Sequence, residues 1–574
     1  MSISCYGLLL VLFVLTPLGL GWPLAVRCTK DPLEQVCAAL LLGFVFCFLI
    51  TFGLYASGLP WAGFALVPVV AMAGLCWRRA AIRSLWRDDD ARHAIIGCIL
   101  VMGWTQALAL LVRSYNGGAW GVDWLEHHQR ALFFREHWDY AFDFFGYQLP
   151  VRPPFANLTV AGFETLTYPT FACDQVVLAL WSSFVFLPAA LFCRRAGGAR
   201  HLPVLVGLLL LNPSFVQNAT FAWTKLPAAF FVLTSAHFFL EALNAPERRA
   251  YFALFVTALT AAMLTHYSAG PYCVIFAGWW LLWRLHGRAW SALRVEAVTG
   301  ALIAIPLLGL WLGWALDHYG VTRTFFVNST TINSGPPGWD LQLARIGRNL
   351  WATLIPHPLR SVDYSFIAQP SRLGWFRDYF FLIVQVNLPA LLGTGGLVAL
   401  ACATLRDWKS WARQTGVVKP VWVLTALAAC SVLGVAVHGA PDEWGLAHIC
   451  LQPLALVGLA LLAARIDRIG RIGGLILGVG LAWDAGVNIG LHFLLEARAP
   501  APEWLALHNP TQALLQYGPA ALNASLKDVA GVRFLHDWFP GFAAPLILLA
   551  IVLMATAVWL RASTQYHRSP AAGL

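Results

Sequence analysis

NGGAWGVDWLEHHQRALFF (Asn116–Phe134) and LPVRPPFANLTVAGFETL (Leu149–Leu166) belong to the longest charged and aromatic passage before residue 317. Hydrophobic runs long enough to cross a bilayer lie on both sides of this passage. A helical segment would place four of its polar side chains on one face, because they stand at relative positions 0, 3, 4 and 7. They are Asp123, Glu126, His127 and Arg130. We expect this passage to form a partly helical loop outside the membrane.

The composition points to a membrane protein. The chain has 574 residues, of which 59% are hydrophobic and 11% are charged, whereas a soluble globular protein has about 25% charged residues. The 27 Trp suit interfacial aromatic belts. The net charge of +10 does not indicate nucleic acid as a partner, because the basic residues concentrate in short loops. The 12 Cys form no CxxC pattern and no Cys/His cluster, which predicts neither a zinc site nor a disulfide framework.

The predicted fold class is an all-α polytopic membrane protein with about 15 transmembrane helices, in a range of 12–15. The predicted spans are roughly residues 5–26, 34–55, 60–77, 94–113, 174–193, 202–218, 224–243, 249–265, 270–285, 296–316, 379–404, 420–438, 446–464, 472–494 and 541–560.

The basic loop RRAAIRSLWRDDDARH (Arg78–His93) fixes the predicted orientation. The positive-inside rule places it in the cytoplasm, and alternation of sides then puts every other short basic loop there too. The large extracytoplasmic segments are 114–173, 317–378 and 495–540. Outer segments of this size suggest chemistry or recognition on that face of the membrane.

Asp123 is the first candidate catalytic residue, and Glu126 is the second. With Glu126 three residues later it fits a capping box, and it also lies about ten residues after a span, where a carboxylate can accept a proton from a substrate hydroxyl. Both interpretations remain open. Of the two adjacent histidines, only His127 shares the Asp123 face, because neighbours on a helix point about 100° apart. The spacing of Asp123, Glu126 and His127 fits polar surface residues better than a metal site, so no metal ligand is predicted, although a divalent cation remains possible.

Several cations stand at the predicted outer ends of spans or in outer loops. Singly, each fits a snorkelling side chain or a local salt bridge, but together they are what a phosphate-linked substrate requires. They are Arg152, Lys225, His266 and Arg360, with Tyr267 and His357 beside two of them.

Asp484 lies in the middle of a predicted span, and His448 begins an earlier one. An ionisable residue at that depth faces a cavity or a partner and not lipid. Hydrogen bonding between helices, a substrate cavity and a proton path all fit Asp484. We count His448 and Asp484 as candidate cavity residues together with His127, Arg130, Tyr267 and His357.

VDWLEHHQRALFF and VRPPFANL resemble the GT-C superfamily of integral-membrane glycosyltransferases. The similarity is to bacterial enzymes like the protein O-mannosyltransferases and the aminoarabinose transferase of lipid A. There, an acidic motif in the first outer loop precedes two membrane-skimming helices separated by a His/Arg-Pro-Pro-Leu-like turn. The resemblance covers roughly 94–465 as a GT-C-like core, preceded by three extra helices in 1–93 and followed by further membrane helices in 466–574.

The resemblance implies a polyprenyl-phosphate sugar as donor and an inverting hexosyl or pentosyl transfer on the extracytoplasmic face of the plasma (inner) membrane. The acceptor would be a glycan, a lipid or a protein. Asp123 would be the general base, and Lys225, His266, Arg360 and Arg152 would hold the lipid phosphate. Two departures are that Trp124 and Leu125 separate the two acidic residues, and that His266 stands where relatives often have Lys.

The implied chemistry suits the residue types. The leaving phosphate needs cationic stabilisation, inversion needs only one base, and the chain has no glycine fingerprint for a nucleotide donor. Two other classes remain open. One is a transporter or flippase, for which Asp484 is the best indication. The other is an O-antigen polymerase or ligase that uses a lipid diphosphate.

Overall fold

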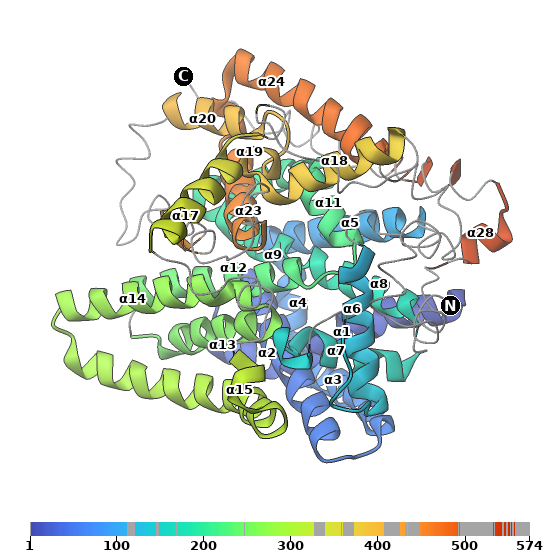
Figure 1. The fold of residues 1–574 in the computed structure, drawn as a ribbon. Coiled ribbons are helices and arrows are strands. Elements are labelled where there is room, and N and C mark those ends of the chain that lie inside the picture. The colour runs from blue at the N-terminus through green and yellow to red at the C-terminus, as the bar shows by residue number, and fades with distance from the viewer. Residues whose placement is uncertain are drawn as a thin grey trace.

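The computed structural model consists of packed helices (Figure 1). It describes residues 2–111, 121–144, 148–167, 170–245, 247–325, 339–356, 359, 372–406, 425–426, 428–430, 433, 448–491, 493, 532, 534–541, 545–546, 549–550, 553 and 556.

The helices of the first half begin with α1 and end with α12. They are α1 (Ile3–Cys28), α2 (Pro32–Ala56), η1 (Trp61–Ala65), α3 (Leu66–Trp77), α4 (Arg79–Arg87), α5 (Asp89–Leu111), α6 (Gly121–Glu136), η3 (Leu149–Val151), α7 (Phe155–Leu166), α8 (Phe171–Ser183), α9 (Phe186–Gly197), η4 (Ala199–His201), α10 (Leu202–Leu211), α11 (Pro213–Thr220) and α12 (Lys225–Asn244).

The helices of the second half continue from α13. They are α13 (Arg249–Thr265), η5 (Tyr267–Ala269), α14 (Gly270–His286), α15 (Trp290–Phe325), α17 (Trp339–Leu354), α18 (Arg372–Val386), α19 (Leu388–Leu391), α20 (Gly396–Arg406), α23 (His448–Ala464), η7 (Ile466–Arg468), α24 (Gly470–Trp483), the π-helix η8 (Asp484–Leu491) and α28 (Phe534–Trp538).

Within the described residues, seven helices are long and apolar enough to cross a membrane, or up to nine if each of two bent helix pairs counts as one span. The seven are Ile3–Cys28, Pro32–Ala56, Asp89–Leu111, Phe171–Gly197, Lys225–Asn244, Trp290–Phe325 and Gly470–Gly490. The predicted class of an all-helical membrane protein is thus confirmed. The expected number of fifteen stays a prediction, since the spans near 420–438 and 541–560 lie mostly outside the described residues.

Two predicted spans are interrupted by breaks in the helix. The span at 202–218 bends by 68° between Leu211 and Pro213, where the Asn212 side chain accepts the amide N–H of Phe215 at 2.7 Å and starts a new helix. The span at 379–404 divides into α18, α19 and α20. Its last break lies at Gly393 and Gly395, whose φ values of 82° and 89° favour glycine.

The N-terminal helices pack onto the rest of the bundle through aromatic rings. Phe44 of α2 stacks on Trp181 of α8, with ring centroids 4.2 Å apart, and both side chains are fully buried. Phe13 of α1 meets Phe163 of α7 edge to face at 4.8 Å. Residues 1–93 therefore share one hydrophobic core with α7 and α8.

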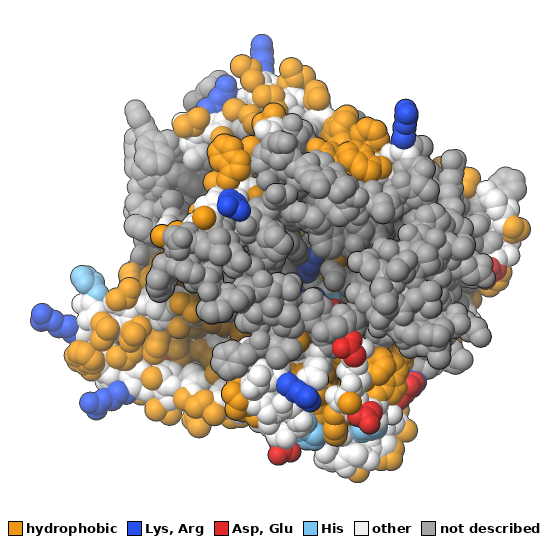
Figure 2. All heavy atoms as spheres, in the orientation of Figure 1, with side chains coloured by type: hydrophobic (Ala, Val, Ile, Leu, Met, Phe, Trp, Pro, Cys, Tyr) orange, Lys and Arg blue, Asp and Glu red, His pale blue; other side chains and the backbone are white. Residues whose placement is uncertain are grey.

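A lipid-facing surface is visible on α14 and α15. Figure 2 shows hydrophobic side chains along both helices and basic side chains at the tip where they join. The exposed apolar residues there include Leu282, which is 69% exposed, and Leu302, which is 71% exposed. The two helices are joined by buried Glu296, which accepts hydrogen bonds from Arg284 Nε at 2.8 Å and Trp280 Nε1 at 2.7 Å. Such an apolar exterior is expected of helices that contact lipid.

Helices α1 and α2 touch at glycines, which gives a first testable prediction. A Cβ added to Gly43 would lie 1.7 Å from the carbonyl oxygen of Pro17, so Gly43→Ala must separate the two backbones. We expect a loss of about 1–3 kcal/mol, measured as a lower thermal unfolding midpoint in detergent. Gly53→Ala on the same helix is the control, because nothing lies within 4 Å of its added Cβ. Equal midpoints for the two variants would contradict the predicted close contact.

Candidate active site

The predicted helix in the first outer loop is α6, which lies beside α7 (Figure 1). It begins at Gly121, so Asp123 is in its first turn and not at the N-cap that the capping-box interpretation would require. The side chain of Asp123 lies outside the described residues. Glu126 and Arg130 follow on the same face, one turn apart, as their spacing predicts.

Glu126 is a buried carboxylate held by two guanidinium groups. Its Oε1 accepts from Arg130 Nε at 2.9 Å and lies 2.7 Å from Arg130 Nη2, while its Oε2 lies 3.5 Å from Arg152 Nη2. Glu126 is 2% exposed and Arg130 is 0% exposed. Burial alone would raise the pKa of Glu126, but the charges of Arg152 and Arg130 outweigh it and lower this pKa to about 2. Glu126 is therefore ionised at neutral pH.

Arg130 also fixes the backbone that carries Arg152. Its guanidinium donates to the carbonyl oxygens of Leu149 at 2.5 Å and Gln148 at 3.3 Å, and it lies over the ring of Phe144, 4.4 Å from the centroid. These bonds attach η3 to α6 immediately before Arg152. Arg130 therefore acts as a positioning residue for its neighbour.

His127 and His266 are buried imidazoles that stay neutral. His127 Nδ1 lies 3.1 Å from Asn157 Oδ1, and burial, reinforced by Arg152 and Arg130, lowers the pKa of His127 to about 4. His266 follows α13, and its Nδ1 accepts the amide N–H of Ser268 at 3.2 Å. Burial lowers the pKa of His266 well below its usual value, and the nearby Arg152, His127 and Lys225 lower it further.

Lys225 and Tyr267 lie beside these residues, at the ends of neighbouring helices. Lys225 is the first residue of α12, is 7% exposed, and has its Nζ 3.2 Å from the ring centroid of Trp223. Tyr267 donates its hydroxyl to the carbonyl oxygen of Pro150 at 3.1 Å and accepts from Trp311 Nε1 at 3.1 Å. Tyr267 thus links α13 and α15 to η3.

The structure therefore brings together seven of the predicted site residues as one group, five of them buried and Arg152 and Tyr267 partly buried, which we name the cation group. It consists of Glu126, His127, Arg130, Arg152, Lys225, His266 and Tyr267. His357, Arg360 and the side chain of His448 lie outside the described residues.

Asp484 lies elsewhere and has a structural partner set. It is 0% exposed, its Oδ2 accepts the amide N–H of Thr394 at 2.8 Å, and its Oδ1 accepts from Asn488 Nδ2 at 3.0 Å. It thus holds the break between α19 and α20. No contact among the described residues joins Asp484 to the cation group.

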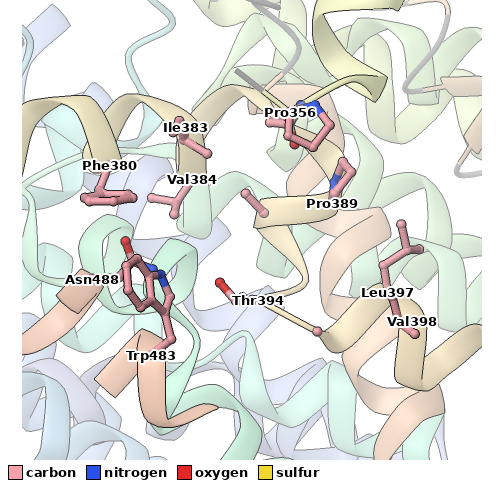
Figure 3. A pocket seen from close by; sticks show the side chains of 13 residues that line it. Pro356, Phe380, Ile383, Val384, Pro389, Thr394, Leu397, Val398, Trp483 and Asn488 are labelled. Atoms are coloured by element: carbon pink, nitrogen blue, oxygen red, sulfur yellow. The ribbon is translucent and has the colours of Figure 1, made fainter. Parts of the chain in front are cut away.

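A mostly apolar pocket of about 380 Å³ lies beside Asp484. Figure 3 shows Phe380, Ile383 and Val384 of α18 with Trp483 and Asn488 below them. Its lining suits a hydrocarbon chain. The sequence analysis did not find this pocket, because the breaks that shape it depend on contacts between distant helices.

The sequence also did not predict a second buried polar group. His128 lies with Glu164 and Asp174, and each of these three residues is at most 2% exposed. The available signal was the presence of two carboxylates in otherwise apolar helices, but their spacing along the chain does not reveal that they meet.

The comparisons with known proteins found a similar overall arrangement in solved structures of one protein. No described protein family and no curated protein matches the chain. The structure is similar to a crystal structure of ArnT from Cupriavidus metallidurans bound to undecaprenyl phosphate, with a TM-score of 0.44, 14% identity, and coverage of 81% of this chain and 75% of that one. For apo ArnT the TM-score is 0.33 and the identity is 15%, with coverage of 65% and 76%.

A second prediction concerns the balance of charge around Glu126. Glu126→Gln leaves Arg130 and Arg152 without their shared carboxylate in a buried place, which we expect to cost about 3–5 kcal/mol of stability. Thermal unfolding in detergent measures it. Glu136→Gln on the same helix is the control, since Glu136 pairs with Arg135 at an exposed position and such pairs contribute about 0–1 kcal/mol. A Glu126 variant as stable as the control would refute this role.

A third prediction follows from the buried imidazoles. The pKa of His127 is about 4 when folded and 6.5 otherwise, so between these pH values the unfolded chain binds a proton that the folded chain does not. Stability should therefore fall as the pH is lowered from about 6.5 to about 4, and His266 acts in the same direction. Unfolding midpoints recorded across this range should show a smaller slope in His127→Gln. The slope should be unchanged in His286→Gln, which alters an exposed residue of α14, and an identical slope in all three proteins would be inconsistent with the prediction.

Proposed function

We propose that this chain is an integral-membrane glycosyltransferase that takes its sugar from a polyprenyl-phosphate donor. The observation that carries the proposal is the convergence of partly buried Arg152 with buried Lys225 and His266 in one group whose single described carboxylate is Glu126. The cation group draws on α6, α12, the turn before α7 and the end of α13.

The charge of the group favours an anionic ligand. Arg130, Arg152 and Lys225 carry three positive charges against the one of Glu126. If Asp123 also reached the group, cations would still outnumber carboxylates by three to two. A phosphate supplies several acceptor oxygens with negative charge, which guanidinium and ammonium groups bind.

The position of the group favours a phosphate attached to a lipid. Lys225 begins a helix that is apolar enough to cross a membrane, and His266 follows the adjacent helix α13. The far end of α12 carries Glu241, paired with Arg195 at 2.6 Å in a basic segment that the positive-inside rule assigns to the cytoplasm. The Lys225 end then faces the extracytoplasmic side, which fits an enzyme of the plasma (inner) membrane.

The proposed reaction is a single displacement. Asp123, one turn before Glu126 on α6, accepts the proton of an acceptor hydroxyl on a glycan, lipid or protein. The hydroxyl oxygen forms a bond to the anomeric carbon while the bond from that carbon to the phosphate oxygen breaks, which inverts the configuration. Arg152 and Lys225 stabilise the charge that develops on the leaving polyprenyl phosphate, and neutral His266 contributes a hydrogen bond.

Glu126 has a different part from Asp123 in this scheme. With a pKa of about 2 it is a weak base at neutral pH, and its oxygens already contact Arg130 and Arg152. Glu126 is therefore proposed to position Arg152.

A fourth prediction tests the function. The purified full-length protein in vesicles should release sugar from a polyprenyl-phosphate sugar, and Asp123→Asn should lower the rate by about 100-fold or more while still binding polyprenyl phosphate. Arg152→Gln and Lys225→Met should weaken that binding. Arg195→Gln is the control for removal of a paired cation and should leave binding and rate unchanged.

Other results would exclude the proposal. Inertness of the wild type toward all such donors, with solute or lipid transport in the same vesicles, would indicate a transporter or flippase. Consumption of lipid diphosphate donors alone would indicate a polymerase or ligase. A full rate in Asp123→Asn would remove this residue from the mechanism.

A further inference from the structure

The second buried polar group joins three helices on the side of α6 away from Glu126. His128 is two residues beyond Glu126, a rotation of about 200° around the helix, so it faces away from the cation group. His128 Nδ1 lies 2.6 Å from Asp174 Oδ2 at the start of α8 and 3.7 Å from Glu164 Oε1 near the end of α7. One ligand atom from each residue can be chosen so that all three lie within 4.8 Å of one another.

Three of the four carboxyl oxygens in this group have no N–H donor within hydrogen-bond distance. Glu164 and Asp174 are each 1% exposed, and apart from the hydrogen bond between the two carboxyl groups, neither oxygen of Glu164 nor Oδ1 of Asp174 has a donor. The cation recorded beside them is Arg135, whose Nη1 is 3.9 Å from Glu164 Oε2. Burial, followed by the neighbouring Asp174, raises the pKa of Glu164 well above its usual value. Buried carboxyl oxygens without partners are costly, which indicates that a further positive group belongs between them.

A comparable group at the other end of the bundle needs no additional positive group, because its carboxyl oxygens have partners. There Glu34, His237 and Glu241 also lie within ligand distance of one another. Glu34 Oε2, however, accepts from Tyr251 at 3.2 Å and from Thr29, and its Oε1 lies 3.0 Å from His237 Nε2. Glu241 pairs with Arg195. The difference between the two groups is therefore the unfilled acceptor capacity of Glu164 and Asp174.

We propose that His128, Glu164 and Asp174 bind one divalent transition-metal ion of the Zn²⁺ type. The ligands are His128 Nδ1 and one carboxylate oxygen from each acidic residue, and water completes the coordination. One imidazole and two carboxylates form a donor set that zinc accepts, whereas Ca²⁺ takes 6–8 oxygen ligands. The ion replaces the proton that joins His128 to Asp174, so binding releases protons to the solvent.

Such an ion attaches α6 to α7 and α8. Helix α6 carries Asp123, Glu126 and Arg130, so the ion would fix the orientation of the helix from the face opposite the cation group. The site does not depend on the proposed function, because its residues contact neither Glu126 nor Arg152 in any recorded bond of the described residues.

The fifth prediction is metal binding by the full-length protein in detergent. After treatment with a chelator, equilibrium dialysis against Zn²⁺ followed by elemental analysis should find one tightly held ion per chain, with proton release measured in weak buffer. Glu164→Gln and Asp174→Asn should weaken binding by more than the roughly 10–100-fold that loss of a supporting partner costs. Glu34→Gln, in the comparison group, should bind Zn²⁺ as the wild type does.

Co²⁺ substitution provides a readout that needs no variant. The wild type with bound Co²⁺ should show visible absorption of a low-coordinate site with nitrogen and oxygen ligands. Wild-type protein that holds no ion after dialysis, or the same affinity in Glu164→Gln and Asp174→Asn, would overturn the proposal. Loss of the ion in Glu126→Gln but not in these two variants would place it in the cation group and would overturn the proposal equally.

Discussion

The contact between Glu126 and Arg130 is the interaction on which the candidate site depends. It joins two fully buried charges one helical turn apart, and Arg130 uses its remaining donors on the carbonyl oxygens of Gln148 and Leu149. The same carboxylate reaches Arg152 at 3.5 Å. One pair of side chains thus sets both the backbone before Arg152 and the direction of its charge.

The remaining groups of the site come from the ends of membrane helices and not from α6. Lys225 and His266 occupy facing ends of the packed helices α12 and α13, and Tyr267 ties that end to Pro150 and to Trp311 of α15. Because Lys225 and His266 are largely buried, the Lys225 charge acts in a medium of lower dielectric constant than water, where an added anion is held more strongly.

The sequence predicted the features that depend on neighbouring residues and missed those that depend on distant ones. Apolar length predicted α2, α5 and α12, and the intervals between Glu126, His127 and Arg130 predicted the helix α6. The break at Gly393 was not predictable, because it is held by Asp484, 91 residues later. The group around His128 was not predictable either, because its partners Glu164 and Asp174 reach it only through the packing of α7 and α8 against α6.

A buried ion pair is a poor way to gain stability alone, because apolar residues of the same volume often serve as well. As far as stability alone is concerned, an apolar side chain packed against Phe144 could replace Arg130. What an apolar side chain cannot do is hold two backbone carbonyls and share a carboxylate with Arg152. The arrangement places the Glu126 carboxylate 3.5 Å from Arg152, and under the proposed function the donor phosphate shares this guanidinium with Glu126. On this view, Glu126 orients Arg152, and the positive charges of Arg152 and Lys225 give the proposed anion its affinity.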